Sequence, residues 1–181
     1  MAPHTIDASI TRDPRAVPAA VAALALAVLG GAYAFQYLGG LEPCKLCLYQ
    51  RWPWWIAGLA GLAGIALGHD RRLRRILILT AGLAMAVGAA IALFHVGVEQ
   101  RWWQGPTSCS SGSALPDTLE AMMAAASRAP VVACNEVAWS LWGISMAGFN
   151  VLISAAGAAA ALAYGLRYAG GSSRGTAEAA R

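Results

Sequence analysis

The sequence predicts an all-α integral membrane protein, and three observations support this fold class. Hydrophobic residues make up 58% of the 181 residues and charged residues only 12%, against roughly 25% in soluble proteins. Four stretches lack Asp, Glu, Lys and Arg, and a bilayer span needs about 20 apolar residues. Three stretches predict spans at 17–38, 76–98 and 141–164, and the second, 52–68, predicts a span at 48–68 by taking in the interfacial residues 48–51, all within one membrane domain, 1–181. A soluble domain is therefore not expected.

Charge sets the expected orientation of these spans. The turn between spans two and three and the two tails, 1–16 and 167–181, together carry a net charge of +5, whereas the remaining loops carry −1. Basic residues are retained on the cytoplasmic side during insertion. We therefore expect both termini in the cytoplasm and loops 39–47 and 99–138 on the opposite face. Orientation also explains the four arginines of the turn, Arg71, Arg72, Arg74 and Arg75, better than a nucleic-acid or anionic-lipid patch does.

Local signals mark the first two spans. Span one ends before Gly39 and Gly40, and its length favours a retained helix over a signal peptide cleaved at the small-residue site 32–34. Pro53 lies in the first turns of span two, where a missing N–H group is tolerated. The glycines of the segment 58–64 allow neighbouring helices to approach closely.

Loop 99–138 is the long segment of the outer face. Its prolines and glycines predict irregular chain, except at 117–128, where apolar side chains at helical spacing predict a short helix. This helix would lie on the membrane surface or against the rest of the loop. The small, polar tail 170–181 is expected to be disordered.

All four cysteines fall in the two outer loops, with Cys44 and Cys47 in the first and Cys109 and Cys134 in the second. In an oxidising compartment such thiols form disulfides, and four cysteines allow three pairings. A disulfide between Cys109 and Cys134 would close a long loop and stabilise it by about 3 kcal/mol. The serines around Cys109 indicate exposure, which suits attack by the thiolate of another protein.

The Cys-x-x-Cys pair lies where a helix is expected to begin. Two intervening residues put both sulfurs within one turn, and the N–H groups and dipole of a helix N-terminus stabilise a thiolate. Arg51 follows Cys47 by four residues and so shares its helix face. The guanidinium would stabilise the Cys47 thiolate or the oxyanion of an electron acceptor. Alternatively, Arg51 is an interfacial side chain that snorkels to water.

Other uses of a cysteine pair are less favoured. Haem attachment needs a histidine after the second cysteine, where this chain has Leu48. Zinc would need Cys109 and Cys134 as further ligands, and no metal site is expected. Two static structural disulfides remain an alternative.

Three segments resemble the family of disulfide bond formation protein B, DsbB, the bacterial inner-membrane thiol oxidase. They are CKLCLYQR at 44–51, HVGVEQRWWQGPTSC at 95–109 and CNEVAWSLWGISM at 134–146. With the four-span layout, the resemblance covers nearly the whole chain except the tails. Ala147 and Phe149 stand where many members have Pro and Trp, which leaves the local shape of span four open.

The resemblance implies an antiparallel four-helix bundle in the bacterial inner membrane, with a quinone, ubiquinone or menaquinone, bound near the periplasmic face. Cys44 and Cys47 would be the pair next to the quinone, with Cys47 facing the ring and Arg51 beside it. His95 and Met146 would line the same pocket; the alternatives are an interfacial packing role for His95 and a core position for Met146.

The resemblance also implies an enzyme that supports disulfide bond formation. Electrons from a periplasmic DsbA-like thioredoxin-fold protein would enter at Cys109, pass from Cys134 to Cys44, and leave through Cys47 to the membrane quinone pool. Two alternatives remain. One is a quinone-linked oxidoreductase of the vitamin K epoxide reductase type, in which the active Cys-x-x-Cys lies late in the chain rather than at the start of span two. The other is a membrane scaffold without enzymatic activity.

Overall fold

The computed structural model describes residues 13–106, 118, 120, 123 and 133–178. This part of the chain contains four helices, α2 (Ala16–Tyr37), α3 (Lys45–Leu67), α4 (Arg71–Glu99) and α6 (Met146–Glu178), and a short hairpin of β1 (Ser140–Leu141) and β2 (Ile144–Ser145). The predicted all-helical character is therefore confirmed. The short helix expected at 117–128 lies outside the described residues, apart from three single positions.

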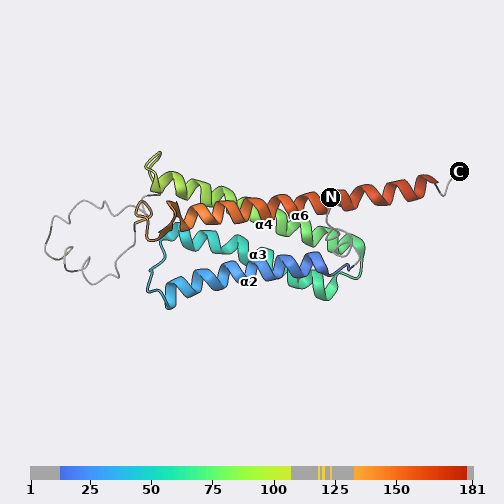
Figure 1. Cartoon of the computed structure of the whole chain (residues 1–181), viewed down its shortest axis with the longest axis horizontal. Coiled ribbons are helices and arrows are strands. Elements are labelled where there is room, and N and C mark those ends of the chain that lie inside the picture. The colour runs from blue at the N-terminus through green and yellow to red at the C-terminus, as the bar shows by residue number, and fades with distance from the viewer. Residues whose placement is uncertain (1–12, 107–117, 119, 121–122, 124–132, 179–181) are drawn as a thin grey trace, which may run out of the picture.

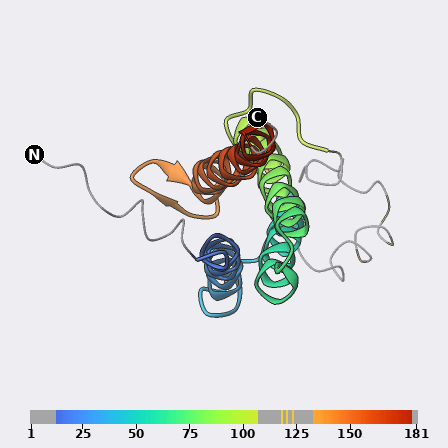
Figure 2. The ribbon, with the colours of Figure 1, turned by 90° about the vertical axis from the view of Figure 1, so that its right-hand side faces the viewer.

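The four helices lie side by side along the long axis of the molecule (Figure 1). Helix α3 packs against both α2 and α4, and α6 packs mainly against α4, whereas α2 and α6 make few contacts with each other. The end-on view shows α2 and α6 at separate corners of the bundle (Figure 2). Helix α3 begins at the same end of the bundle as the hairpin, opposite the turn that joins α3 to α4. The Cys44–Cys47 segment and the residues before α6 therefore meet at one end.

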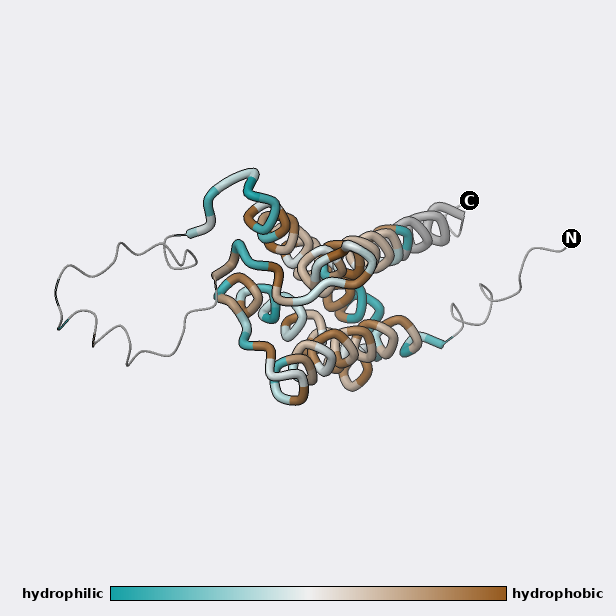
Figure 3. The backbone as a smooth tube through the Cα atoms, turned by 60° about the vertical axis from the view of Figure 1, so that its left-hand side comes forward, coloured by the Kyte–Doolittle hydropathy of each residue, from teal (hydrophilic) through white to brown (hydrophobic). Residues whose placement is uncertain are grey.

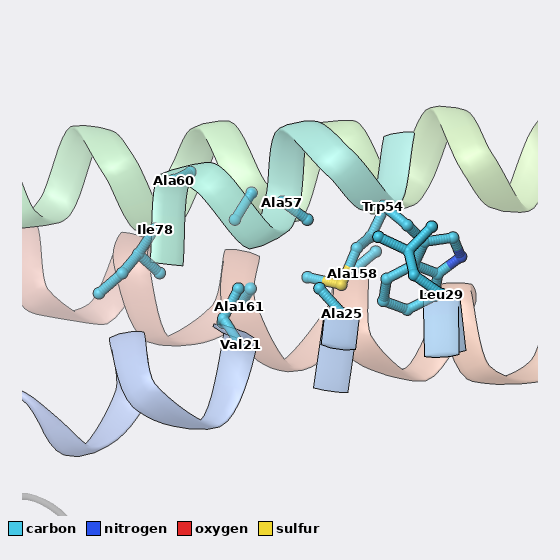
Figure 4. Close-up of a cluster of buried hydrophobic side chains, with 11 residues drawn as sticks. Val21, Ala25, Leu29, Trp54, Ala57, Ala60, Ile78, Ala158 and Ala161 are labelled. Carbon is cyan, nitrogen blue, oxygen red and sulfur yellow. The ribbon is translucent and has the colours of Figure 1, made fainter. Parts of the chain in front are cut away.

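Small side chains dominate the core between the helices. Alanines from all four helices pack around the two largest fully buried side chains, Trp54 and Met85, so the helix backbones approach closely (Figure 4). Gly61 marks a close approach of α3 to the backbone of α2, because a Cβ atom there would lie 2.8 Å from the backbone nitrogen of Ala22 and 2.9 Å from the carbonyl oxygen of Pro18. Packing at this point requires the absence of a side chain.

The outer faces of the helices are apolar, as a lipid environment requires. Large side chains such as Leu59, Leu83 and Leu152 are more than half exposed, and hydrophobic positions, coloured brown, recur along the helices (Figure 3). Three segments are long and apolar enough to cross a membrane: Ala16–Tyr37, Arg71–Glu99 and Met146–Arg167. The span expected at 48–68 lies in α3, which is not among them, because Gln50, Arg51 and three tryptophans lower the hydropathy of its first turns. Tryptophan and arginine in such a position are typical of a membrane interface.

Helix boundaries differ from the expected spans most clearly at the start of α4 and at both ends of α6. The basic cluster lies in the first turns of α4 rather than in the preceding turn, because Asp70 caps this helix and accepts hydrogen bonds from the backbone N–H groups of Arg72 and Leu73. The last helix begins at Met146 instead of 141, since residues 140–145 form the hairpin, whose turn residues Trp142 and Gly143 both have positive φ.

The expectation of a disordered tail at 170–181 is wrong as far as Glu178, where α6 ends. No proline interrupts the sequence after the start of α6, although Gly170, Gly171 and Gly175 lie in its last turns. Glycine has a low helix propensity, so local propensity does not explain why the helix continues past the end of the apolar segment.

We expect Gly61→Ala to destabilise the protein by about 1–3 kcal/mol, the usual cost of overpacking. The added methyl group would meet the backbone of α2, which cannot move aside as a flexible side chain can. Thermal unfolding of the purified protein in detergent measures the change. Gly30→Ala is the matched control, because a Cβ atom at Gly30 meets nothing within 4 Å. Equal melting temperatures for the two variants would contradict this account of the α2–α3 contact.

Candidate functional site

The first cysteine pair is built into the start of α3. Cys44 is the N-cap residue of this helix, with extended backbone angles, and its sulfur accepts a hydrogen bond from the backbone N–H of Cys47 at 3.3 Å. Pro43 precedes it and disfavours helical angles at Glu42, so the helix does not extend back into the loop. The two sulfur atoms lie 3.0 Å apart as free thiols, within one helical turn. The cap therefore holds both sulfurs in reach of each other.

The two thiols of the pair have different acidities. Both residues precede the span expected at 48–68. Cys44 donates a hydrogen bond to Cys47, and this bond together with burial raises the pKa of Cys44 to about 12. The same hydrogen bond lowers the pKa of Cys47. Cys47 therefore loses its proton at lower pH than Cys44 does.

Cys134 lies against this pair although it is 87 residues further along the chain than Cys47. Its side chain is fully buried and belongs to one apolar cluster with Cys44, Leu46 and Val98, and Cys47 packs against this cluster. A cysteine from the segment before α6 is thus packed with the pair at the start of α3. Cys109, the fourth cysteine, lies outside the described residues.

His95 contacts the pair from α4. Its Nε2 atom lies 3.5 Å from the sulfur of Cys44 and 3.9 Å from Oε1 of Glu99, one turn further along the same helix. The other oxygen of Glu99 accepts a hydrogen bond of 2.5 Å from the hydroxyl of Ser145. The side chains of His95 and Glu99 are 3% and 5% exposed, so these groups form a polar cluster shielded from solvent.

A row of hydrogen bonds continues from His95 into the apolar bundle. The Nδ1 atom of His95 lies 2.8 Å from the amide nitrogen of Gln50, and Asn150 donates to the amide oxygen of Gln50 at 2.6 Å. The indole of Trp54 and the hydroxyl of Ser154 donate to the amide oxygen of Asn150 at 2.9 and 3.0 Å. These polar groups satisfy one another, as groups buried among apolar helices must.

Arg51 is fixed by two side chains of α2. Its guanidinium donates a hydrogen bond of 2.8 Å to the amide oxygen of Gln36 and lies 4.7 Å above the centre of the Tyr33 ring. Neither partner neutralises the charge of Arg51, because an amide and an aromatic ring carry none. The cation is therefore held in one place while its charge stays available.

Two cavities meet at Cys47. The larger has a volume of about 480 Å³, is lined mainly by apolar side chains of α2, α3 and α6, and includes Cys47, Arg51 and Met146. Phe35, Trp139 and Phe149 form part of its wall, with Trp139 packed between the other two rings. The smaller has about 30 Å³ and is lined by Cys44, Cys47, His95 and Glu99 among others. Cys47 and Met146 belong to the walls of both cavities.

The structure distributes the predicted site residues over these two cavities. Arg51 lines the larger one, Cys47 and Met146 line both, and His95 lines the smaller one and contacts Cys44. Ala147 and Phe149, the departures from the family pattern, both line the larger cavity.

Sequence reasoning missed the polar residues around the predicted ones. These are Gln36, Gln50, Glu99, Ser145 and Asn150. A signal for Gln50 and Asn150 was present, since a strongly polar side chain inside an apolar span is expensive and indicates a functional site. Their partners could not be inferred, because the three helices involved are far apart in sequence.

Three potential ligand atoms for a metal ion lie close together. The sulfurs of Cys44 and Cys47 and a ring nitrogen of His95 lie within 4.8 Å of one another. Two thiolates and an imidazole would suit a zinc ion by ligand type. Whether the imidazole presents a free lone pair depends on the hydrogen bonds of its other nitrogen.

Comparison with known proteins identifies a family and several relatives that carry the name of that family. The family described as Disulfide bond formation protein DsbB matches residues 14–164. Disulfide bond formation protein B of Verminephrobacter eiseniae is 31% identical over 79% of this chain and 81% of its own. The protein of the same name from Haemophilus influenzae is 33% identical over 71% of this chain and 72% of its own. No solved structure shows a significant match.

We expect an alkylating reagent to modify Cys47 before Cys44 in the fully reduced protein near neutral pH. The thiolate is the reactive form, so the lower pKa of Cys47 brings its reaction to lower pH, and Cys44 reacts only as pH approaches its raised pKa of about 12. In Cys44→Ala the donor is lost, and the midpoint of Cys47 alkylation should move to higher pH. Mass spectrometry of the labelled peptides measures both rates.

The denatured protein serves as the control, because its two thiols should react alike. Faster modification of Cys44 in the folded protein, or an unchanged Cys47 midpoint in Cys44→Ala, would contradict the assignment of the thiolate.

Proposed function

Because the chain belongs to the family of disulfide bond formation protein DsbB, we propose that it reoxidises a periplasmic DsbA-like dithiol protein and passes two electrons to a membrane quinone, ubiquinone or menaquinone. One observation carries this proposal: Cys47 lies between a buried cluster containing Cys44 and Cys134 and a large apolar cavity containing a fixed cation. Sulfur chemistry and an apolar acceptor site thus share one residue.

The proposed relay begins with the partner protein. The partner's thiolate attacks Cys109 of a Cys109–Cys134 disulfide, and resolution gives the oxidised partner and two reduced loop thiols. Cys134 then attacks Cys44 of the Cys44–Cys47 disulfide, so that a Cys44–Cys134 bond forms and the electron pair remains on Cys47 as a thiolate. The packing of Cys134 against Cys44 supports this step, since no large movement of these two residues is needed.

The relay ends when the pair closes again. Cys109 displaces Cys44 from Cys134, and the released Cys44 sulfur bonds to Cys47. Forming this disulfide releases two electrons, and with two protons they reduce a quinone to a quinol. The hydrogen bond from Cys44 stabilises the thiolate form of Cys47. It therefore favours negative charge on a residue that lines the larger cavity.

The larger cavity fits a quinone headgroup by size and chemistry. Its volume of about 480 Å³ lies within the usual range for small-molecule sites, its wall is mostly apolar, and Arg51 offers a hydrogen-bond donor and a positive charge to a quinone oxygen. The weak contact between α2 and α6, which both line it, leaves this side of the bundle accessible from the lipid phase.

Energetics also favour a quinone as the acceptor. A DsbA-like partner is a strong oxidant, with a potential of about −120 mV, so an ordinary disulfide would accept its electrons only uphill. Each 30 mV corresponds to about 1.4 kcal/mol for two electrons. A strong terminal acceptor is therefore required.

The proposed orientation places the cysteines in the periplasm. The basic first turns of α4 and both ends of the described chain lie at the opposite end of the bundle, which would be cytoplasmic. Of the alternatives, an enzyme of the vitamin K epoxide reductase type is disfavoured by the position of the Cys-x-x-Cys pair at the start of α3. A scaffold with static disulfides leaves the cavity beside Cys47 unexplained.

Cys109→Ala should abolish oxidation of the DsbA-like partner, because the entry sulfur is lost. The same variant should keep quinone-dependent reoxidation of the Cys44–Cys47 pair after reduction by a small dithiol. Partner oxidation and pair reoxidation are measured separately by thiol labelling under anaerobic conditions.

Cys134→Ala is the companion variant, and it should behave alike in both assays. Loss of pair reoxidation in Cys109→Ala would contradict the proposal, because Cys109 would then be needed for the quinone-dependent step as well. A wild-type protein whose pair is not reoxidised faster with quinone than without it would be a scaffold rather than an oxidase.

Arg51→Met should raise the KM for quinone by about tenfold and leave the KM for the partner nearly unchanged. This size corresponds to the loss of one charge-assisted hydrogen bond of about 1.5 kcal/mol. Steady-state quinone reduction measures both constants. Arg101→Met makes the same change at an exposed cation outside the larger cavity and should not alter the quinone KM. An unchanged quinone KM in Arg51→Met would make Arg51 an interfacial anchor only.

A further inference from the structure

The buried row of hydrogen bonds from Trp54 to His95 has a direction that its first member fixes. An indole N–H group can only donate, so the Asn150 atom next to Trp54 must be the amide oxygen. The hydroxyl of Ser154 donates to the same oxygen. The amide nitrogen of Asn150 therefore faces Gln50, and it donates to the amide oxygen of Gln50 at 2.6 Å.

The orientation of Asn150 in turn fixes that of Gln50. With its oxygen occupied by Asn150, Gln50 turns its amide nitrogen toward His95, at 2.8 Å from Nδ1. An amide nitrogen donates and does not accept, so Nδ1 of His95 must present its lone pair. In a neutral imidazole the hydrogen then lies on Nε2, the atom 3.5 Å from the sulfur of Cys44 and 3.9 Å from Glu99.

We propose that Trp54, Asn150 and Gln50 are positioning residues that set the tautomer of His95, so that His95 presents an N–H group to the sulfur of Cys44. Glu99, which Ser145 holds through its other oxygen, faces the same N–H group. The three positioning residues do not touch the reacting sulfurs and act only through the imidazole.

The role of this N–H group rests on the proposed function. When Cys109 displaces Cys44 from Cys134, a Cys109–Cys134 bond forms, the Cys44–Cys134 bond breaks, and the electron pair stays on the Cys44 sulfur. A hydrogen-bond donor at that sulfur stabilises the departing thiolate. The hydrogen bond from His95 is also among the influences that lower the pKa of Cys44, although the hydrogen bond to Cys47 and burial outweigh it in the reduced pair.

The same tautomer disfavours a metal ion at this cluster. A histidine that binds a metal through Nε2 normally carries its hydrogen on Nδ1 and donates it to an acceptor. Here Nδ1 faces a donor, so the lone pair points toward Gln50 and away from Cys44 and Cys47. The three clustered ligand atoms therefore fit sulfur exchange better than zinc binding.

Nitrogen-15 NMR of the histidine rings in the reduced, full-length protein tests the proposal directly. At a pH well above the ordinary histidine pKa of about 6.5, His95 should show an unprotonated Nδ1 and a protonated Nε2. The His95→Asn variant identifies its signals among those of the three histidines. A protonated Nδ1 in the wild-type protein would overturn the proposal, and so would conversion of Nε2 to a metal-bound signal on addition of zinc.

Gln50→Glu replaces the amide nitrogen that faces Nδ1 of His95 with a carboxylate oxygen, so a donor becomes an acceptor with little change in shape. A carboxylate accepts from His95, so the Nδ1 signal should move from the unprotonated to the protonated range. Gln36→Glu makes the same substitution beside Arg51 and should leave the His95 signals unchanged. An unchanged Nδ1 signal in Gln50→Glu would contradict the proposed positioning role. These spectra do not depend on turnover, so failure of the quinone reaction would leave them as expected and would count against the proposed function alone.

Discussion

The start of α3 at Cys44 is the constraint on which the site depends. Because Cys44 caps the helix, its sulfur accepts the N–H of Cys47, and the two sulfurs come to lie 3.0 Å apart. The cap also sets which face of α3 each following residue occupies. Cys47 and Arg51 then line the larger cavity, and Gln50, which also lines it, contacts His95 through its amide nitrogen. One local hydrogen bond thus orients the redox pair, the cation and the polar row together.

Burial of polar groups among apolar helices shapes the rest of the site. A polar atom without a partner would be costly there, so each one must find a donor or acceptor on another helix. The row from Trp54 through Asn150 and Gln50 to His95 joins α3, α6 and α4 in this way. Small side chains at the core bring these helices close enough for the row to form. The membrane fold and the chemistry of Cys44 therefore depend on the same packing.

Composition predicted the helical class, and short motifs predicted the family and the cysteine and arginine residues of the candidate site. Contacts between distant segments could not be predicted from the sequence. Nothing in the spacing of His95 showed that its ring meets Cys44 rather than the larger cavity, because that depends on how α4 rotates against α3. The hairpin at 140–145 lies within an apolar stretch, so the sequence did not distinguish it from the start of a span. The glycines of the tail argued against a helix there, so the length of α6 was not predicted. The cluster of charged residues from Asp70 to Arg75 is evident in the sequence, but the role of Asp70 as the N-cap of α4 was not predicted.

The most direct test of the account is the stoichiometry of electron transfer in the purified protein. A reduced DsbA-like partner and a quinone are mixed with catalytic amounts of the protein without oxygen, and partner disulfide and quinol are counted. The account predicts one quinol for each partner disulfide, with no quinol formed when Cys47 is replaced by Ala. Oxidation of the partner without quinol, or full quinol formation by the Cys47→Ala variant, would contradict it.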